Sequence, residues 1–111
     1  MIILLSCNKE LNIHINKLDN VTIVKNIYNC YQILIKPDLD CYLLLLDAKM
    51  FTNELFDNFV TWIIRQNLPI HTILIYNTEN NSNITKGIRR LNKKMYKTKQ
   101  ITQEQLIKAL E

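Results

Sequence analysis

The stretch CYLLLLDAKM, residues 41–50, decides the fold. Residues 41–46 are apolar or aromatic without interruption, which is typical of a strand buried on both faces of a parallel sheet. Asp47 follows directly, and a carboxylate is costly in an apolar setting unless it is paired or lies at an open site. In open parallel sheets, ligands and reactive groups gather outside the carboxyl ends of the strands. We therefore expect Asp47 at the functional edge of a sheet.

Strand-like and helix-like segments alternate along the rest of the chain. Short apolar runs predict five strands, at residues 2–6, 21–24, 41–46, 72–76 and 94–97. Apolar residues at helical spacing predict a helix after each strand. The side chains expected to cap four of these helices are Asn8, Asn26, Thr52 or Asn53, and Thr102. This alternation predicts an α/β fold with a parallel sheet and helices on both of its faces.

Length and composition exclude several classes of protein. The 111 residues suit one domain, 1–111. No apolar run approaches the roughly 20 residues of a membrane span, and the start of the chain lacks the basic region of a signal peptide. The single glycine, Gly87, excludes glycine-rich phosphate loops. Three widely spaced cysteines, Cys7, Cys30 and Cys41, favour a reducing cytoplasm over a disulfide framework or a metal site.

Positive charge is concentrated late in the chain. Residues 1–85 contain six basic and eight acidic side chains, whereas residues 86–99 contain seven basic ones and no acid. The seven are Lys86, Arg89, Arg90, Lys93, Lys94, Lys97 and Lys99. Helical spacing places the basic residues of the predicted fourth helix opposite its apolar side, so they should be exposed. The run is either a solvated face or a binding surface. We expect no direct binding of nucleic acid, because no reading helix or stacking platform accompanies it.

Residues at three predicted strand ends resemble the receiver domain of bacterial response regulators. Asp47 follows the third strand, Asn77 and Thr78 follow the fourth, and Lys99 follows the fifth. The segments DAKMF (47–51) and YKTKQITQEQL (96–106) are similar to the family's DxxMP and YLxKPxxxxxL segments. The resemblance covers the whole chain. It implies a flavodoxin-like (βα)5 three-layer sandwich whose five-stranded parallel sheet has the order 2-1-3-4-5.

The resemblance also implies roles for these residues. Asp47 is equivalent to the Asp that accepts a phosphoryl group, and Lys99 to the Lys that contacts that group. The Thr or Ser that senses phosphorylation corresponds to Asn77 in an alignment without gaps, with Thr78 next to it. Tyr96 occupies the position of the family's switch aromatic residue.

The acidic pocket of the family is missing from this sequence. Working receivers carry two acidic residues after the first strand, which hold Mg²⁺ together with the strand-three Asp. Ser6, Cys7 and Asn8 stand there instead. Mg²⁺ prefers an octahedron of carboxylate and water oxygens, which a single carboxylate and a thiol supply poorly. We therefore expect Mg²⁺ to bind weakly or not at all, no other cofactor, and a salt bridge between Asp47 and Lys99.

The sequence thus predicts an atypical receiver domain, not an enzyme, that acts in signal transduction or transcription control by protein–protein interaction. In the family, the surface of the fourth helix, fifth strand and fifth helix binds a partner or a second copy. Three alternatives stay open: a phosphorylatable receiver, a phosphoryl carrier using Asp47 or Cys7, and the pseudo-receiver of a pilus-assembly ATPase. Whether an output domain follows Glu111 is not determined.

Overall fold

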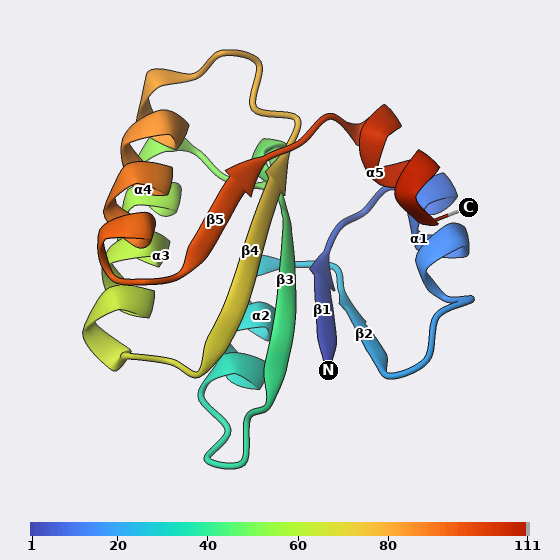
Figure 1. Cartoon of the computed structure of the whole chain (residues 1–111), viewed down its shortest axis with the longest axis horizontal. Helices are drawn as coiled ribbons and strands as arrows, with labels where there is room; N and C mark the ends of the chain where they lie inside the picture. Colours follow the sequence, from blue (N-terminus) through green and yellow to red (C-terminus); the bar gives the residue numbers. More distant parts are fainter. Residues whose placement is uncertain (111) are drawn as a thin grey trace.

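The structure, a computed structural model, describes residues 1–110 of the chain, and the side chain of Leu110 also lies outside the description. Strands and α-helices alternate along this part of the chain (Figure 1). The elements are β1 (Ile2–Leu5), α1 (Lys9–Ile15), β2 (Val21–Val24), α2 (Ile27–Leu34), β3 (Cys41–Asp47), the 3₁₀ turn η1 (Ala48–Met50), α3 (Asn53–Gln66), β4 (Ile70–Tyr76), α4 (Ser82–Lys93), β5 (Lys97–Gln100) and α5 (Gln103–Leu110). The predicted βαβαβαβαβα order is therefore confirmed.

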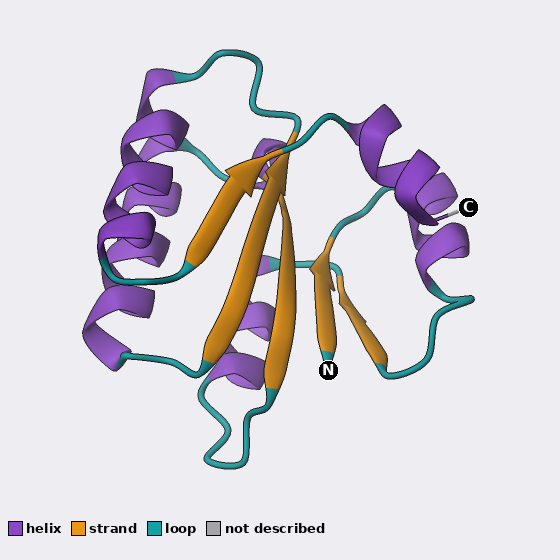
Figure 2. Ribbon diagram, viewed as in Figure 1, coloured by secondary structure: helices purple, strands orange, loops and turns teal. Residues whose placement is uncertain are grey.

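All neighbouring strands pair in parallel, in the order β2-β1-β3-β4-β5. The flavodoxin-like (βα)5 architecture expected from the sequence is thus confirmed. Helices α1 and α5 lie side by side on one face of the sheet, and α2, α3 and α4 cover the other (Figure 1). The loops that leave the carboxyl ends of the strands gather along one edge, the upper edge in Figure 2. Among the described residues, no helix is both long and apolar enough to cross a bilayer.

Side-chain caps fix where the helices begin. The side chains of Asn8, Asn26 and Thr52 each accept a hydrogen bond from a backbone amide in the first turn of the next helix. Thr102 and Gln105 form a reciprocal pair at the start of α5, with 3.0 Å in both directions. Each cap satisfies amides that a helix leaves without an internal partner. The predicted caps are confirmed, with Thr52 rather than Asn53 at α3.

The face of the sheet under α2, α3 and α4 carries the larger core. Phe59 is fully buried at its centre, with ring-centroid distances of 5.2 Å to Tyr31 and 5.3 Å to Phe51. Helix α4 packs against α3 at Gly87, where an added Cβ would lie 3.2 Å from Val60 Cγ2 and would also meet the Phe56 ring. The only glycine of the chain therefore permits a close helix–helix approach.

The face under α1 and α5 carries a smaller core. Its buried members are Leu4, Leu11, Ile15, Leu45, Tyr76 and Leu106. Leu43 and Leu74, on the same face, stay half-buried. Helices α1 and α5 contain only seven and eight residues, about 10–12 Å of helix, whereas β3 and β4 contain seven residues each, about 23 Å of strand. The two short helices therefore leave part of this face uncovered.

The fifth strand was predicted at the wrong place. It occupies Lys97–Gln100 rather than residues 94–97, so Lys99 lies within the strand and not after it. Helix α4 ends at Lys93, and Met95 then adopts a left-handed conformation with φ of 71°. The chain resumes at Tyr96, whose buried hydroxyl donates a 2.9 Å hydrogen bond to the carbonyl of Leu68. Because this hydrogen bond fixes Tyr96 beside the segment after α3, β5 begins only at Lys97.

The first turn of α3 places one of two neighbouring apolar residues outside the core. Leu55 is 44% exposed. The neighbouring Phe56 takes the inward position in the first turn of α3.

Candidate functional site

Asp47 is the last residue of β3 and is only 7% exposed. Its Oδ1 accepts two hydrogen bonds of 3.0 Å, one from the side-chain amide of Asn77 and one from the backbone amide of Lys49. The second bond makes Asp47 the N-cap of η1. The carboxylate is thus stabilised by neutral donors at the carboxyl edge of the sheet.

The register of the sheet brings Asn77 to this carboxylate. Asp47 lies opposite Tyr76, the last residue of β4, and Asn77 follows at once. The backbone of Asn77 is left-handed, with φ of 59°, a conformation that Asn tolerates better than most residues. The sequence identified both positions. It did not identify the hydrogen bond between them. The only signal for that bond in the sequence is an Asn directly after the strand that neighbours the strand of Asp47.

The predicted salt bridge between Asp47 and Lys99 is wrong. Within residues 1–110, the ion pairs are Lys49–Glu79 at 3.2 Å and Arg90–Asp57 at 2.8 Å. Lys99 lies inside β5, opposite Leu74, with an exposed side chain. The shift of β5 toward the C-terminus moves Lys99 away from the strand end, and the Asn77 amide serves the carboxylate instead.

The three residues after β1 serve the backbone. Ser6 is fully buried, and its Oγ accepts a 3.0 Å hydrogen bond from the amide of Asn8. Asn8 caps α1. Cys7 is exposed, and its thiol donates to the carbonyl of Lys25 at 3.2 Å. The structure therefore brings Ser6, Cys7 and Asn8 to the same edge as Asp47, and the side chain of each forms a hydrogen bond with the backbone.

The donors around Asp47 do not fit an Mg²⁺ ion. Among the described residues, no three His, Cys, Asp or Glu side chains lie close enough together to hold a metal. Asn77 presents its NH₂ group to the carboxylate rather than its oxygen, and Glu79 is paired with Lys49. A magnesium site needs several oxygen ligands directed at one point. No cluster of three acidic or other metal-binding side chains supplies them among the described residues, so we derive no chemistry through this ion.

Two buried polar atoms on the α1/α5 side have no hydrogen-bond partner in the described structure, namely the hydroxyl of Tyr76 and Oδ1 of Asn12. Burial raises the pKa of Tyr76; the nearby Ser6 hydroxyl opposes this shift and the Asp47 carboxylate adds to it. By the geometry of the described residues, the Tyr76 hydroxyl makes no hydrogen bond to Ser6. Unpaired buried groups of this kind are few in folded proteins. Among the described residues, both of these unpaired polar atoms therefore lie on the α1/α5 side of the sheet.

Thr78 and Tyr96, which the resemblance makes equivalent to switch residues, form hydrogen bonds away from Asp47. Thr78 donates from Oγ1 to Oε1 of Gln100 at 3.2 Å, which ties the loop after β4 to the end of β5. Tyr96 is 6% exposed and is held by the carbonyls of Leu68 and, at 3.4 Å, Ile63. Burial also raises the pKa of Tyr96. Tyr96 lies between α4 and β5 in the sequence. Its side chain points inward and its hydroxyl contacts the backbone at the end of α3.

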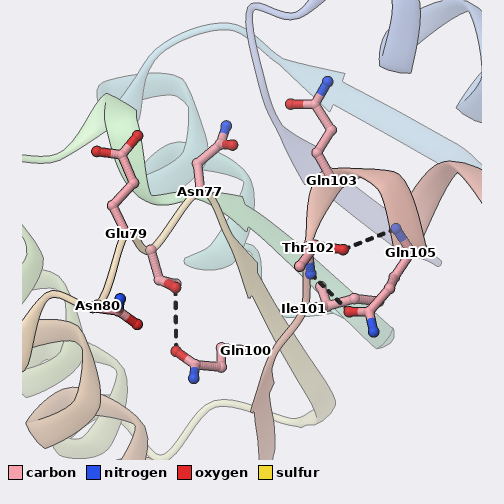
Figure 3. A pocket seen from close by; sticks show the side chains of 9 residues that line it. Asn77, Glu79, Asn80, Gln100, Ile101, Thr102, Gln103 and Gln105 are labelled. Atoms are coloured by element: carbon pink, nitrogen blue, oxygen red, sulfur yellow. Dashed lines mark hydrogen bonds between the residues drawn. The ribbon is translucent and has the colours of Figure 1, made fainter.

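Two shallow hollows flank the loop after β4. One, of about 420 Å³, lies between this loop and the segment that enters α5 (Figure 3). The other, of about 350 Å³, lies beside η1. Asn77 borders both, and the Thr78–Gln100 hydrogen bond joins two residues that line the first. The first is lined mainly by amide and hydroxyl side chains together with Glu79, and the second also contains Lys49, which is paired with Glu79.

The basic residues lie on α4, on the turn after it and on β5. By strand alternation from Leu74, the side chains of Lys97 and Lys99 face the α1/α5 side of the sheet, so the basic residues extend around the β5 edge. Arg90 is half-buried and reaches α3, where it bonds Asp57 and the hydroxyl of Thr61, each at 2.8 Å. We therefore define the basic surface by the exposed side chains Lys86, Arg89, Lys93, Lys94, Lys97 and Lys99. Arg90 was expected to be freely exposed; instead it fastens α4 to α3.

The remaining cysteines are buried thiols with raised pKa values. Cys30 and Cys41 are buried in the larger core. Burial raises the pKa of Cys30 to about 12 and that of Cys41 to about 11. A nucleophilic cysteine needs its thiolate form.

No family model, curated protein or solved structure matches the chain.

Proposed function

We propose that this chain is an atypical receiver domain that acts in signalling or transcription control by binding a protein, without Mg²⁺-dependent phosphoryl transfer. The observation that carries the proposal is the position of Asp47. It ends the central strand of a sheet ordered β2-β1-β3-β4-β5, and its carboxylate contacts the residue that follows β4. That is the arrangement expected from the resemblance to receivers.

The surroundings of Asp47 favour a structural role over phosphoryl transfer. Its Oδ1 caps η1 and accepts from Asn77, so one of the two carboxylate oxygens already has a structural role. The charge that gathers during phosphoryl transfer is normally offset by metal ions and cationic groups. Lys99 is not bonded to Asp47, and Lys49 is paired with Glu79. A phosphorylatable receiver or a carrier using Asp47 or Cys7 remains the alternative of another class.

The basic surface is the binding site that we propose for the partner. Six exposed cations on α4 and β5 meet no acidic partner among the described ion pairs. An acidic protein surface would complement them and be attracted at low ionic strength. We place the chain in the reducing cytoplasm, where its three free thiols would persist. We propose no direct contact with nucleic acid or with a membrane.

The test is recovery of a partner from the chain's own cells. Tagged wild type and a Lys86→Glu/Arg89→Glu variant are used with nuclease-treated extracts at low and high salt. We expect an acidic protein to be retained by the wild type at low salt, and to be lost with the variant or when the Debye length falls below about 8 Å. Lys9→Glu/Lys17→Glu, on α1 and its following loop, is the matched control and should keep the partner.

Retention should also be independent of phosphodonor and Mg²⁺ and should survive Asp47→Asn. If retention requires Mg²⁺ and acetyl phosphate and is abolished by Asp47→Asn, the conventional receiver is correct and the proposal fails. A retained ATPase of a pilus-assembly system would favour the pseudo-receiver alternative.

A further inference from the structure

The two edges of the sheet differ in whether their backbone groups are paired. At the β5 edge, the side-chain amide of Asn92 accepts from the backbone amide of Thr98 at 2.9 Å and donates to its carbonyl at 3.1 Å. This side chain therefore takes the place of a neighbouring strand at the centre of β5. The flanking Lys97 and Lys99 add charge, which also disfavours strand pairing at an edge.

The β2 edge has no such protection. Its four residues, VTIV, contain neither charge nor proline. The amide of Ile2 donates to the carbonyl of Asn20 at 2.9 Å, and that of Ser6 to the carbonyl of Val24 at 3.0 Å. In a parallel ladder, alternate residues bond to the same neighbour, so the amides and carbonyls of Val21 and Ile23 point away from the sheet. An uncharged strand with free outward groups is a template for another strand.

We propose that β2 pairs in an antiparallel manner with β2 of a second copy of this chain, about a two-fold axis at Thr22. In this register, Val21 of each copy lies opposite Ile23 of the other. Both residues present outward backbone groups, so each Val21–Ile23 pair exchanges two hydrogen bonds, as a hydrogen-bonded antiparallel pair does. The same axis makes the interface isologous and closed, so association stops at two copies.

The charges at the ends of β2 favour the same register. Asp19 lies before the strand and Lys25 after it, and both are exposed. Antiparallel pairing about Thr22 brings Asp19 of one copy to the end of the strand where Lys25 of the other copy lies. Two opposite-charge contacts therefore form in the dimer. A parallel arrangement would instead put like charges at the same end.

The dimer forms at the opposite side of the sheet from the basic surface, and it does not rest on the proposed function. It joins two five-stranded sheets into one of ten strands and leaves both basic surfaces free. Four residues per copy make a small interface compared with the roughly 1,600 Å² of standard protein–protein interfaces. We therefore expect association that depends on concentration rather than a permanent dimer.

The first test is a charge exchange measured by sedimentation equilibrium of the full chain across a concentration series. Asp19→Lys alone and Lys25→Asp alone should each weaken dimerisation about tenfold, because each creates two like-charge contacts. The double variant Asp19→Lys/Lys25→Asp should restore the wild-type constant. A double variant as weak as the single ones, or single variants that dimerise like the wild type, would overturn the register.

The second test follows individual amides by hydrogen exchange at low and high protein concentration. The amides of Val21 and Ile23 should exchange rapidly when dilute and become protected when concentrated, whereas Thr22 and Val24 should be protected throughout. Ile23→Pro removes an outward amide that β1 does not use and should abolish dimerisation while the far-ultraviolet spectrum stays unchanged. A wild type that stays monomeric at about 1 mM, a concentration at which even weak complexes form, would refute the proposal.

Discussion

Helices α2, α3 and α4 bury the central strands on their face of the sheet, whereas α1 and α5 leave part of the central strands exposed on theirs. Leu44, Ile73 and Ile75, on the first face, have no exposed surface. Leu43 and Leu74, their neighbours along the same strands, are half-buried on the second. The difference follows from the number and the length of the helices, because α2 is as short as α5 but α3 and α4 contain 14 and 12 residues. We therefore expect the first layer to contribute more to the stability of the fold than the second.

The second face also holds the polar groups of the carboxyl edge. By strand alternation from Leu4 and Leu45, Ser6 and Asp47 point to the same side as Tyr76. The described unpaired polar atoms, on Tyr76 and Asn12, lie on this side too. A well-packed layer on one face can offset such costs on the other.

The largest expected loss of stability comes from a substitution in the larger core. Phe59→Ala removes a fully buried ring from the aromatic cluster and should lower the free energy of unfolding by about 3–5 kcal/mol. Leu106→Ala, in the smaller core, is 3% exposed in the wild type and should cost about 2 kcal/mol, the lower end for such changes. Urea unfolding of both variants measures the difference. An equal or greater loss for Leu106→Ala would contradict the ranking of the two faces.

The next effect probes how tightly α4 packs on α3. Gly87→Ala introduces a Cβ that would lie 3.1 Å from Cζ of Phe56. Overpacking typically costs about 1–3 kcal/mol, which should exceed the gain of about 1 kcal/mol in helix propensity. We expect a lower melting temperature. Thr85→Ala, at an exposed position of the same helix, is the control and should not lower it. Stabilisation by Gly87→Ala would show that the helices can separate without cost.

Substitutions at Asp47 separate the hydrogen bonds from the charge. Asp47→Ala removes the acceptor for Asn77 and Lys49 and should cost about 1–2 kcal/mol, as loss of a capping side chain does. Asp47→Asn keeps an acceptor oxygen and should stay within about 0.5 kcal/mol of the wild type. Equal losses in thermal unfolding would mean that the charge matters. A clear rise in melting temperature for Asp47→Asn would indicate acidic neighbours.

The smallest effect has the opposite sign. Tyr76→Phe removes a buried hydroxyl that has no partner, so the free energy of unfolding should be unchanged or higher by up to about 1 kcal/mol. Calorimetry of this variant and of Tyr96→Phe compares the stability effects of removing the two hydroxyls. Tyr96→Phe loses the 2.9 Å bond to Leu68 and should be destabilised. A loss of stability for Tyr76→Phe would mean that its hydroxyl bonds to Ser6 after all.

The sequence was sufficient for the architecture because its local signals agree with one another. Apolar runs end at capping residues such as Asn8 and Thr52, and the structure uses each of them. The fifth strand was misplaced because Lys97–Gln100 is almost entirely polar, while the preceding residues contain Tyr96. That aromatic ring serves packing on α3 rather than strand formation. Periodicity cannot distinguish these two uses.

The candidate site was only partly predictable. Spacing brought Asp47 and Asn77 to the correct strand ends, since the topology fixes which ends meet. The actual partner of the carboxylate depended on a three-residue shift of β5 and on a left-handed Asn77. Contacts such as Arg90–Asp57 and Asn92–Thr98 join residues whose pairing is decided by tertiary packing. No local pattern encodes them.

The most direct test of the proposed function is intact mass after incubation with acetyl phosphate and Mg²⁺, together with an Mg²⁺ titration followed by amide shifts around Asp47. We predict no added phosphoryl group and no saturable shift at sub-millimolar Mg²⁺, because Oδ1 of the carboxylate is held by Asn77 and the amide of Lys49, and no cluster of metal-binding side chains lies among the described residues. A phosphoryl group that appears on Asp47 in the wild type and is absent from Asp47→Asn would contradict the proposed function.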